Sequence, residues 1–173
     1  MRSVRARLTG GDRRSVGRAN DVARELNEGS LGCGEVVALL FDVDPIVRMR
    51  AADALEKASA LRPALLTPFR ATLLRLVREE KQMEVRWHLA QMIPRLRLRS
   101  AARAAAVRAL ERYLNDSSSI VRTYALEAIV QILGSDPRNK VDILELLRDA
   151  RRSGSPAMRA RARKLTTGLK KLK

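Results

Sequence analysis

The chain has 173 residues, long enough to bury a sizeable core, and 46% of them are hydrophobic. Its one cysteine, Cys33, excludes an internal disulfide, and its one histidine, His88, leaves too few ligands for a zinc site of the histidine and cysteine type. The net charge is +16, and no apolar run approaches the ~18 residues that cross a bilayer. We therefore expect a basic cytoplasmic protein with no membrane segment, metal or cofactor.

The two ends of the chain carry most of the excess positive charge. Residues 1–20 contain six arginines and one acid, and residues 151–173 contain nine Lys or Arg and no acid. We expect residues 1–14 to be a disordered basic tail. Apolar residues then recur at helical spacing, which predicts a capping helix at 15–27 and a single folded domain at 15–173.

Four segments after this helix repeat at intervals of 36 to 38 residues. An arginine marks each copy at the same position: Arg48, Arg86, Arg122 and Arg159. In the first three copies, apolar residues stand one before and three, four and seven after the arginine, which is one face of an amphipathic helix. A second helix is predicted before each of these. The resulting helical hairpins cover about 31–60, 62–97, 100–133 and 137–171.

The segment from Asp42 reads Asp-x-Asp-Pro-x-Val-Arg-x-x-Ala-Ala-x-Ala-Leu and resembles the HEAT repeat, including the bacterial HEAT-like repeat proteins. The resemblance implies an all-α protein of armadillo type, a right-handed alpha-alpha superhelix formed by a HEAT-like solenoid of about four helical hairpins. It also implies a ladder in which an acid of each turn pairs with a repeat arginine. That acid is Asp42, Glu80 and Asp116 in the first three copies, and the ladder should end at the fourth, which has Ser153. A rival interpretation makes the repeat arginines a phosphate-binding row.

Position +2, counted from each repeat arginine, points away from the predicted core and would form a row along the concave surface. Together with position +5, the row is mixed in charge and contains aromatic residues, which suits an acidic or amphipathic segment of a protein partner. We therefore predict a protein-binding scaffold or adaptor, present as a monomer; the alternative is that this face is only solvated. The predicted partner-binding residues are Arg50, Trp87, His88, Tyr124, Arg161, Asp53, Gln91 and Glu127.

DNA or RNA binding is the main alternative, because the isoelectric point is near 11.4. The near-neutral segment 21–150 and the scarcity of aromatic residues argue against it. The candidate nucleic-acid contacts are Arg103, Arg108, Arg112, Lys164, Lys170 and Lys171.

An enzyme is a third possibility, because some HEAT-like proteins are DNA glycosylases or bilin lyase subunits. Only Trp87 and Tyr124 are placed to line such a cleft, and no catalytic motif is present, so we predict no catalytic residue. His88 could be a general base, but the favoured interpretation is that it is a surface residue. Cys33 lies between two glycines near a helix start, where a thiol can be acidified, but a structural role is favoured.

Overall fold

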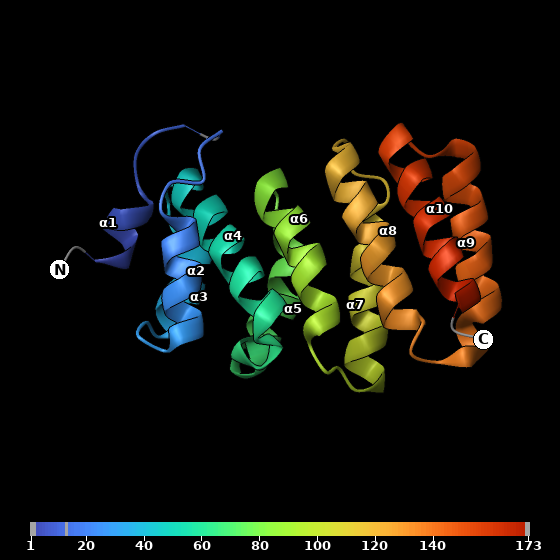
Figure 1. Cartoon of the computed structure of the whole chain (residues 1–173), viewed down its shortest axis with the longest axis horizontal. Helices are drawn as coiled ribbons and strands as arrows, with labels where there is room; N and C mark the ends of the chain where they lie inside the picture. Colours follow the sequence, from blue (N-terminus) through green and yellow to red (C-terminus); the bar gives the residue numbers. More distant parts are fainter. Residues whose placement is uncertain (1–2, 13, 172–173) are drawn as a thin grey trace. The chain divides into compact units, whose positions relative to one another are not determined.

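The structure, a computed structural model, describes residues 3–12 and 14–171, with side chains through residue 169 (Figure 1). All regular structure in these residues is helical and none of it is strand, which confirms the prediction of an all-α chain. Among the same residues, no helix is both long enough and apolar enough to cross a membrane.

The chain divides into two compact units, residues 1–97 and residues 98–173. The division differs from the predicted single domain of residues 15–173 and lies between the second and third predicted hairpins. The repeat interval continues unchanged through this point, so the sequence carries no signal of the division.

The first unit is arranged around its longest helix, α4 (Pro45–Leu61). Asp44 caps this helix by accepting the N–H of Ile46 at 2.8 Å, and Pro45 occupies the first turn, as the sequence indicates. Helix α4 packs against α2 on one side and α6 on the other (Figure 1). The other elements are α1 (Val4–Leu8), α2 (Ala19–Glu28), α3 (Cys33–Ala38), η1 (Leu39–Phe41), η2 (Pro63–Phe69), α5 (Arg70–Glu79), α6 (Met83–Met92) and η3 (Ile93–Arg95).

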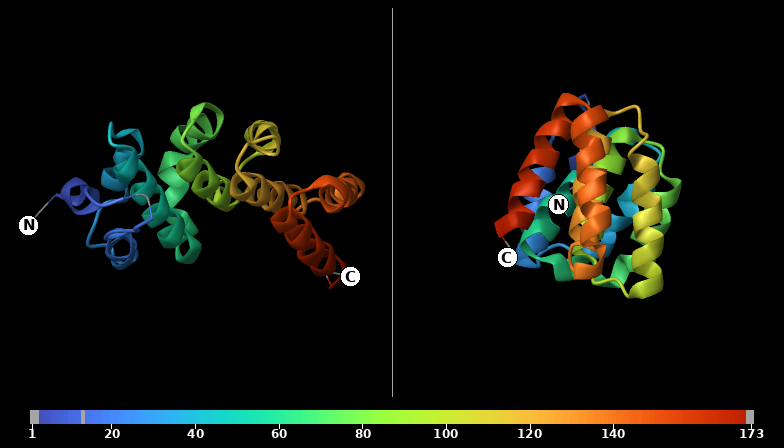
Figure 2. Two further views of the ribbon diagram at one scale, coloured as in Figure 1. Left: turned by 90° about the horizontal axis from the view of Figure 1, so that it is seen from above. Right: turned by 90° about the vertical axis from the view of Figure 1, so that its right-hand side faces the viewer.

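The second unit consists of two helical hairpins. Helix α8 packs against both α7 and α10, and Figure 2 shows α9 and α10 lying side by side. Leu126 and Val130 of α8 meet Ile143 and Leu147 of α9 and Met158 of α10 in one buried cluster. The elements are α7 (Ser100–Tyr113), α8 (Ser119–Leu133), η4 (Pro137–Asn139), α9 (Lys140–Ser153) and α10 (Pro156–Lys171).

Burial confirms the apolar positions predicted from the repeat. The valine before each of the first three repeat arginines, Val47, Val85 and Val121, is fully buried. The positions three, four and seven after the arginine are at most 2% exposed: Ala51, Ala52, Leu55, Leu89, Ala90, Ile93, Ala125, Leu126 and Ile129. Each helix therefore presents the predicted face to the core.

Polar contacts between neighbouring hairpins of one unit also recur at the repeat interval. Each joins two residues that are 34 to 39 positions apart in the sequence. The contacts run from Arg48 to Gln82, Lys57 to Asn20, Arg62 to the Leu26 carbonyl, Arg95 to Glu56 and Arg161 to Glu127. Such contacts are expected where equivalent hairpins stack in register.

The N-terminal segment is not the predicted disordered tail in the residues that the structure describes. Residues 4–8 form α1, and Leu8 is fully buried. Arg50 of α4 donates hydrogen bonds to five backbone carbonyls of this segment, those of Leu8, Thr9, Gly10, Asp12 and Ser15. Gly17 passes so close that a Cβ there would lie 2.8 Å from the Arg50 guanidinium carbon. Backbone carbonyls have no sequence signature, so the pattern could not reveal this contact.

Candidate partner-binding site

The repeat arginines hold the turns that precede their own helices. Three of the four, Arg48, Arg122 and Arg159, donate Nη1 hydrogen bonds to backbone carbonyls five or six residues earlier. The bonds run from Arg48 to Asp42 (2.7 Å) and Val43 (3.3 Å), from Arg122 to Asp116 and Ser117 (3.0 Å), and from Arg159 to Gly154 (2.8 Å). This use favours a structural role for these arginines over a row of free phosphate-binding groups.

The acids of the turns accept N–H groups of their own turns. Asp42 accepts from Asp44 at 2.9 Å, Glu80 from Gln82 at 2.7 Å and Asp116 from Ser118 at 2.8 Å. Asp42 also binds the guanidinium of Arg5 at 2.7 Å, which holds the pKa of Asp42 below its ordinary value. Between the first two hairpins, the arginine-to-acid ladder is replaced by a bond from Arg48 to Gln82.

The prediction that position +2 faces solvent is wrong in the first unit. Arg50 is 2% exposed because the N-terminal segment covers it, and His88 is 8% exposed. Burial lowers the pKa of His88 to about 4, so its ring is neutral at pH 7. The neighbouring Asp53 is also buried and binds Lys57 at 2.7 Å. These polar side chains are therefore not available as a partner surface.

The other predicted partner-binding residues of the first unit are partly accessible. Trp87 and Gln91 are half-buried, and the Trp87 ring meets the His88 ring edge-on with 5.5 Å between centroids. His88 Nε2 lies 4.0 Å from an Asp53 carboxylate oxygen, beyond hydrogen-bonding distance. The structure thus brings together three predicted residues, Asp53, Trp87 and His88, as a packed cluster.

In the second unit the predicted residues bind one another. Arg161 forms an ion pair with Glu127 and lies over the Tyr124 ring, with 5.5 Å between the guanidinium carbon and the ring centroid. All three side chains are half-buried. Their charges are mutually satisfied, so this part of the row offers an aromatic surface with little net charge.

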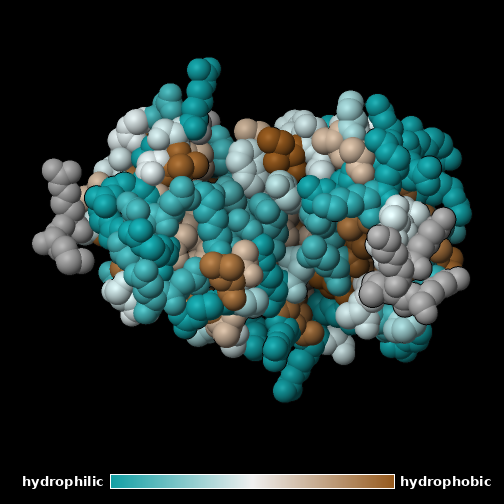
Figure 3. Space-filling model, in the orientation of Figure 1, coloured by the Kyte–Doolittle hydropathy of each residue, from teal (hydrophilic) through white to brown (hydrophobic). Residues whose placement is uncertain are grey.

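The candidate nucleic-acid residues fall into three groups. Arg108 and Arg112 are exposed one turn apart on α7, and Lys164 is exposed on α10. Arg103 is half-buried and donates to the Leu133 carbonyl at 3.4 Å, so it is not the solvent-facing group that was predicted. The side chains of Lys170 and Lys171 lie outside the described residues. Figure 3 shows hydrophilic residues over most of the face it displays, with only scattered hydrophobic patches.

Each unit contains a notch beside a repeat arginine, between the turns of two neighbouring hairpins. The first notch has a volume of about 380 Å³ and is lined by residues that include Phe41, Arg48 and Glu80. Gln82, the residue before α6, does not cap its own helix. Its side-chain oxygen accepts from Arg48 Nε at 2.9 Å, and its amide nitrogen donates to the Pro45 carbonyl at 2.8 Å. An internal amide therefore occupies one edge of the Arg48 guanidinium.

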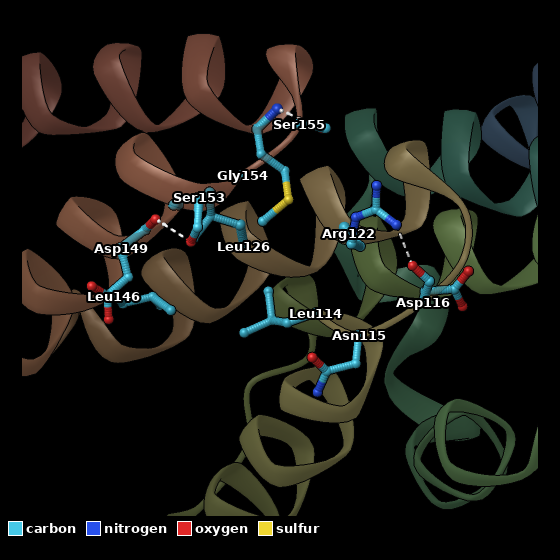
Figure 4. Close-up of a pocket in the computed structure, with 12 residues that line it drawn as sticks. Leu114, Asn115, Asp116, Arg122, Leu126, Leu146, Asp149, Ser153, Gly154 and Ser155 are labelled. Atoms are coloured by element: carbon cyan, nitrogen blue, oxygen red, sulfur yellow. Dashed lines mark hydrogen bonds between the residues drawn. The ribbon is translucent and has the colours of Figure 1, made fainter.

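The second notch is larger, with a volume of about 640 Å³, and contains Arg122 at the position that matches Arg48 (Figure 4). The residue that matches Gln82 is Ser155, whose short side chain accepts the N–H of Met158 in its own helix at 3.3 Å. Ser153 replaces the acid of the turn. Within the described part of the chain, no hydrogen bond is made by Nε or Nη2 of Arg122, and its Nη1 is bound to carbonyls.

The surroundings of Arg122 combine apolar and polar groups. The apolar part of the lining is Leu114, Leu126, Leu146, Ala150 and Met158. Two acids also line the notch, but Asp149 pairs with Arg152 at 2.8 Å and Asp116 accepts from its own turn. Sequence reasoning missed this notch, although its signal was present in the loss of the acid at Ser153.

The Cys33 side chain lies in a packed position at the start of α3. Cys33 is half-buried, its thiol donates to the Leu65 carbonyl at 3.5 Å, and burial raises its pKa, which favours the structural interpretation. In the residues that the structure describes, no three His, Cys, Asp or Glu side chains gather where they could hold a metal ion.

No protein-family model matches the chain, and the search of curated proteins also gave no match. Among solved structures, the crystal structure of an engineered protein, a target of the Northeast Structural Genomics Consortium, is similar with a TM-score of 0.65. The sequences are 20% identical, and the match covers 96% of this chain and 78% of that one. At this identity the likeness shows the fold alone. The fold defines an all-α protein built from consecutive helical hairpins.

Proposed function

We propose that the chain is a HEAT-like repeat protein whose hairpins form a right-handed superhelix, and that it acts as a cytoplasmic adaptor without catalytic activity. The burial of the predicted repeat positions and the contacts at the repeat interval support this architecture. Proteins of this type bind partners along surfaces that the repeats build together.

The observation that carries the proposal is the second notch. It combines an arginine with an unoccupied edge, an apolar lining and a volume of about 640 Å³, which lies in the range of ordinary binding pockets. The second unit, residues 98–173, contains 17 Lys or Arg and seven Asp or Glu, so its formal charge favours an acidic partner. We therefore propose an acidic or amphipathic segment of a protein as the partner. The notch replaces the row at position +2 as the main contact.

Nucleic-acid binding is the second candidate, and the exposed pair Arg108 and Arg112 on α7 favours it. Neither side chain has an ion pair in the described part of the chain, so both are available to phosphate groups. Glu111 lies between them and is exposed as well, which weakens the positive field of this face.

Affinity capture with the full chain separates the two candidates. The bait is the purified protein, and the native lysate is either treated with nuclease or left untreated. We expect the bait to capture the same proteins after nuclease treatment. The variant Arg108→Glu/Arg112→Glu should capture them as well. Each captured protein, once purified, should bind the bait on its own. Capture that disappears with nuclease or with this charge reversal contradicts the adaptor and supports nucleic-acid binding.

A further inference from the structure

We infer that the second notch is a pocket for a side-chain carboxylate of the partner, with an adjoining apolar group of the same segment seated on the leucine lining. This inference rests on the proposed adaptor function and names the chemistry of its main contact. It follows from comparing two notches that the repeat builds at matching positions.

The first unit shows what the free edge of a repeat arginine accepts. Beside the first notch, the Gln82 side chain presents an sp² oxygen to Arg48 Nε at 2.9 Å. A planar side-chain group with an oxygen acceptor therefore fits beside a repeat arginine. In the first unit the protein supplies this group itself. Gln82 does not cap α6, so its side chain is available to bind Arg48.

The second notch lacks an internal group of this kind. Ser155 is too short to cross the notch, and its hydroxyl is used in capping α10. A side chain at Gly154 would clash with the Ala150 carbonyl, so this position cannot supply one either. The guanidinium edge that Gln82 binds in the first unit is thus left to an external group in the second.

The geometry of Arg122 selects a carboxylate over an amide. Its Nη1 is held by the carbonyls of Asp116 and Ser117, which fixes the guanidinium plane. The remaining edge presents two parallel donors, Nε and Nη2. A carboxylate matches both of them with two oxygens, whereas an amide offers one acceptor. Arg122 is half-buried, so solvent screens its charge less than that of an exposed arginine.

The two acids in the notch do not cancel this preference. Asp149 forms an ion pair with Arg152 at 2.8 Å, and Asp116 accepts the Ser118 N–H at 2.8 Å. The apolar side chains Leu126, Leu146 and Met158 line the same space and leave room for a methylene chain or an aliphatic side chain. The pocket therefore fits an amphipathic acidic segment rather than a fully hydrated ion.

Hexanoate is a direct probe, because it carries one carboxylate on an aliphatic chain. We expect saturable binding to the full protein in an NMR titration that follows the Met158 methyl group. Hexanamide, which keeps the size and loses the charge, should bind about tenfold more weakly or worse. Equal binding of hexanamide and hexanoate would overturn the assignment of a carboxylate site.

The variant Ser155→Gln places the residue type that binds Arg48 in the first unit at the matching position beside Arg122, without changing Arg122. We expect hexanoate affinity to fall about tenfold or more, because the new side chain competes for the Arg122 edge. Thr167→Gln adds the same side chain to an exposed position of the same helix and should leave affinity unchanged. An unchanged affinity in Ser155→Gln refutes the pocket.

The converse variant, Glu80→Ser/Gln82→Ser, should free the Arg48 edge beside the first notch and raise the number of hexanoate sites from one to two. Circular dichroism before the titration establishes that this variant is folded. If the folded variant still binds one equivalent, the internal Gln82 is no guide to the ligand and the inference is wrong.

A short acetylated peptide of alternating Glu and Leu residues, and its Gln-for-Glu counterpart, test the source of the carboxylate. We expect the Glu peptide alone to bind, and Ser155→Gln to abolish its binding. If hexanoate binds and the Glu peptide does not, the site takes small carboxylates and the partner segment is wrong. If partners captured from lysate remain bound to Ser155→Gln, the adaptor function stands while this pocket is refuted.

Discussion

The two units carry arginines at equivalent repeat positions, but the surroundings of these arginines differ. In the first unit, Arg48 is bridged by Gln82 and Arg50 is enclosed by the N-terminal segment. In the second, Arg122 keeps an open edge, and Arg161 lies half-buried over Tyr124. The repeat sets where an arginine stands, and its neighbours decide whether it stabilises the fold or stays available for binding.

The largest expected effect tests the buried cores of the two units. Val121→Asp should destabilise the second unit by about 4 kcal/mol or more, because an unpaired charge would enter a fully buried position. Val47→Asp should do the same to the first unit. Chemical denaturation followed by circular dichroism measures both. Ile120→Asp, at a neighbouring position that is 45% exposed, is the control and should change stability by about 0.5 kcal/mol or less. A stable Val121→Asp protein would contradict the repeat register.

The next effect separates the +2 residues His88 and Tyr124 by pH. Burial lowers the pKa of His88 to about 4 in the folded state, against about 6.5 when unfolded. The unfolded chain therefore binds the proton more tightly, so stability falls as the pH drops from about 6.5 to 4, by about 3 kcal/mol. His88→Gln should remove this dependence. Tyr124→Phe should keep it, since this change leaves His88 in place. The carboxylates Asp42 and Asp136, whose pKa values are lowered, act at lower pH.

A smaller effect compares the +2 arginines of the two units. Arg50→Ala should cost about 2 kcal/mol, because buried backbone carbonyls lose a charged donor. Arg161→Ala should cost about 1 kcal/mol or less, since its ion pair with Glu127 is partly exposed. Thermal denaturation gives the two values, and hydrogen exchange should rise at residues 8–17 only in Arg50→Ala. Equal costs would remove the distinction between the units at this position.

The smallest effect concerns the residues before α6 and α10. Gln82→Ala should cost about 1 kcal/mol through the lost bridge to Arg48, and a double-mutant cycle with Arg48→Ala should show coupling. Ser155→Ala should cost a similar amount through the lost cap of α10, with no coupling to Arg122. Coupling between positions 155 and 122 would show that the Ser155 side chain already interacts with the Arg122 guanidinium.

Much of the fold was predictable because its signals are local. Helical periodicity placed Val47, Val85 and Val121 in the core, and Asp44-Pro45 marked the start of α4. The candidate site was predictable only in part. Arg50 and His88 follow the outward side of that periodicity, yet other segments cover them. The open arginine edge of the second notch results from Ser155, a short residue at the position where the first unit has the longer Gln82.

The sequence by itself determined the helices, their buried faces and the interval at which hairpins recur, because these depend on contacts within one or two helical turns. Only the tertiary structure decided which arginines are occupied. Those decisions rest on contacts between residues 34 to 42 positions apart, such as Arg48 with Gln82 and Arg50 with the Leu8 carbonyl. Backbone carbonyls are the same for every residue type, so a sequence pattern cannot predict which side chains bind them. Arg122 keeps an open edge because Ser155 is too short to reach it.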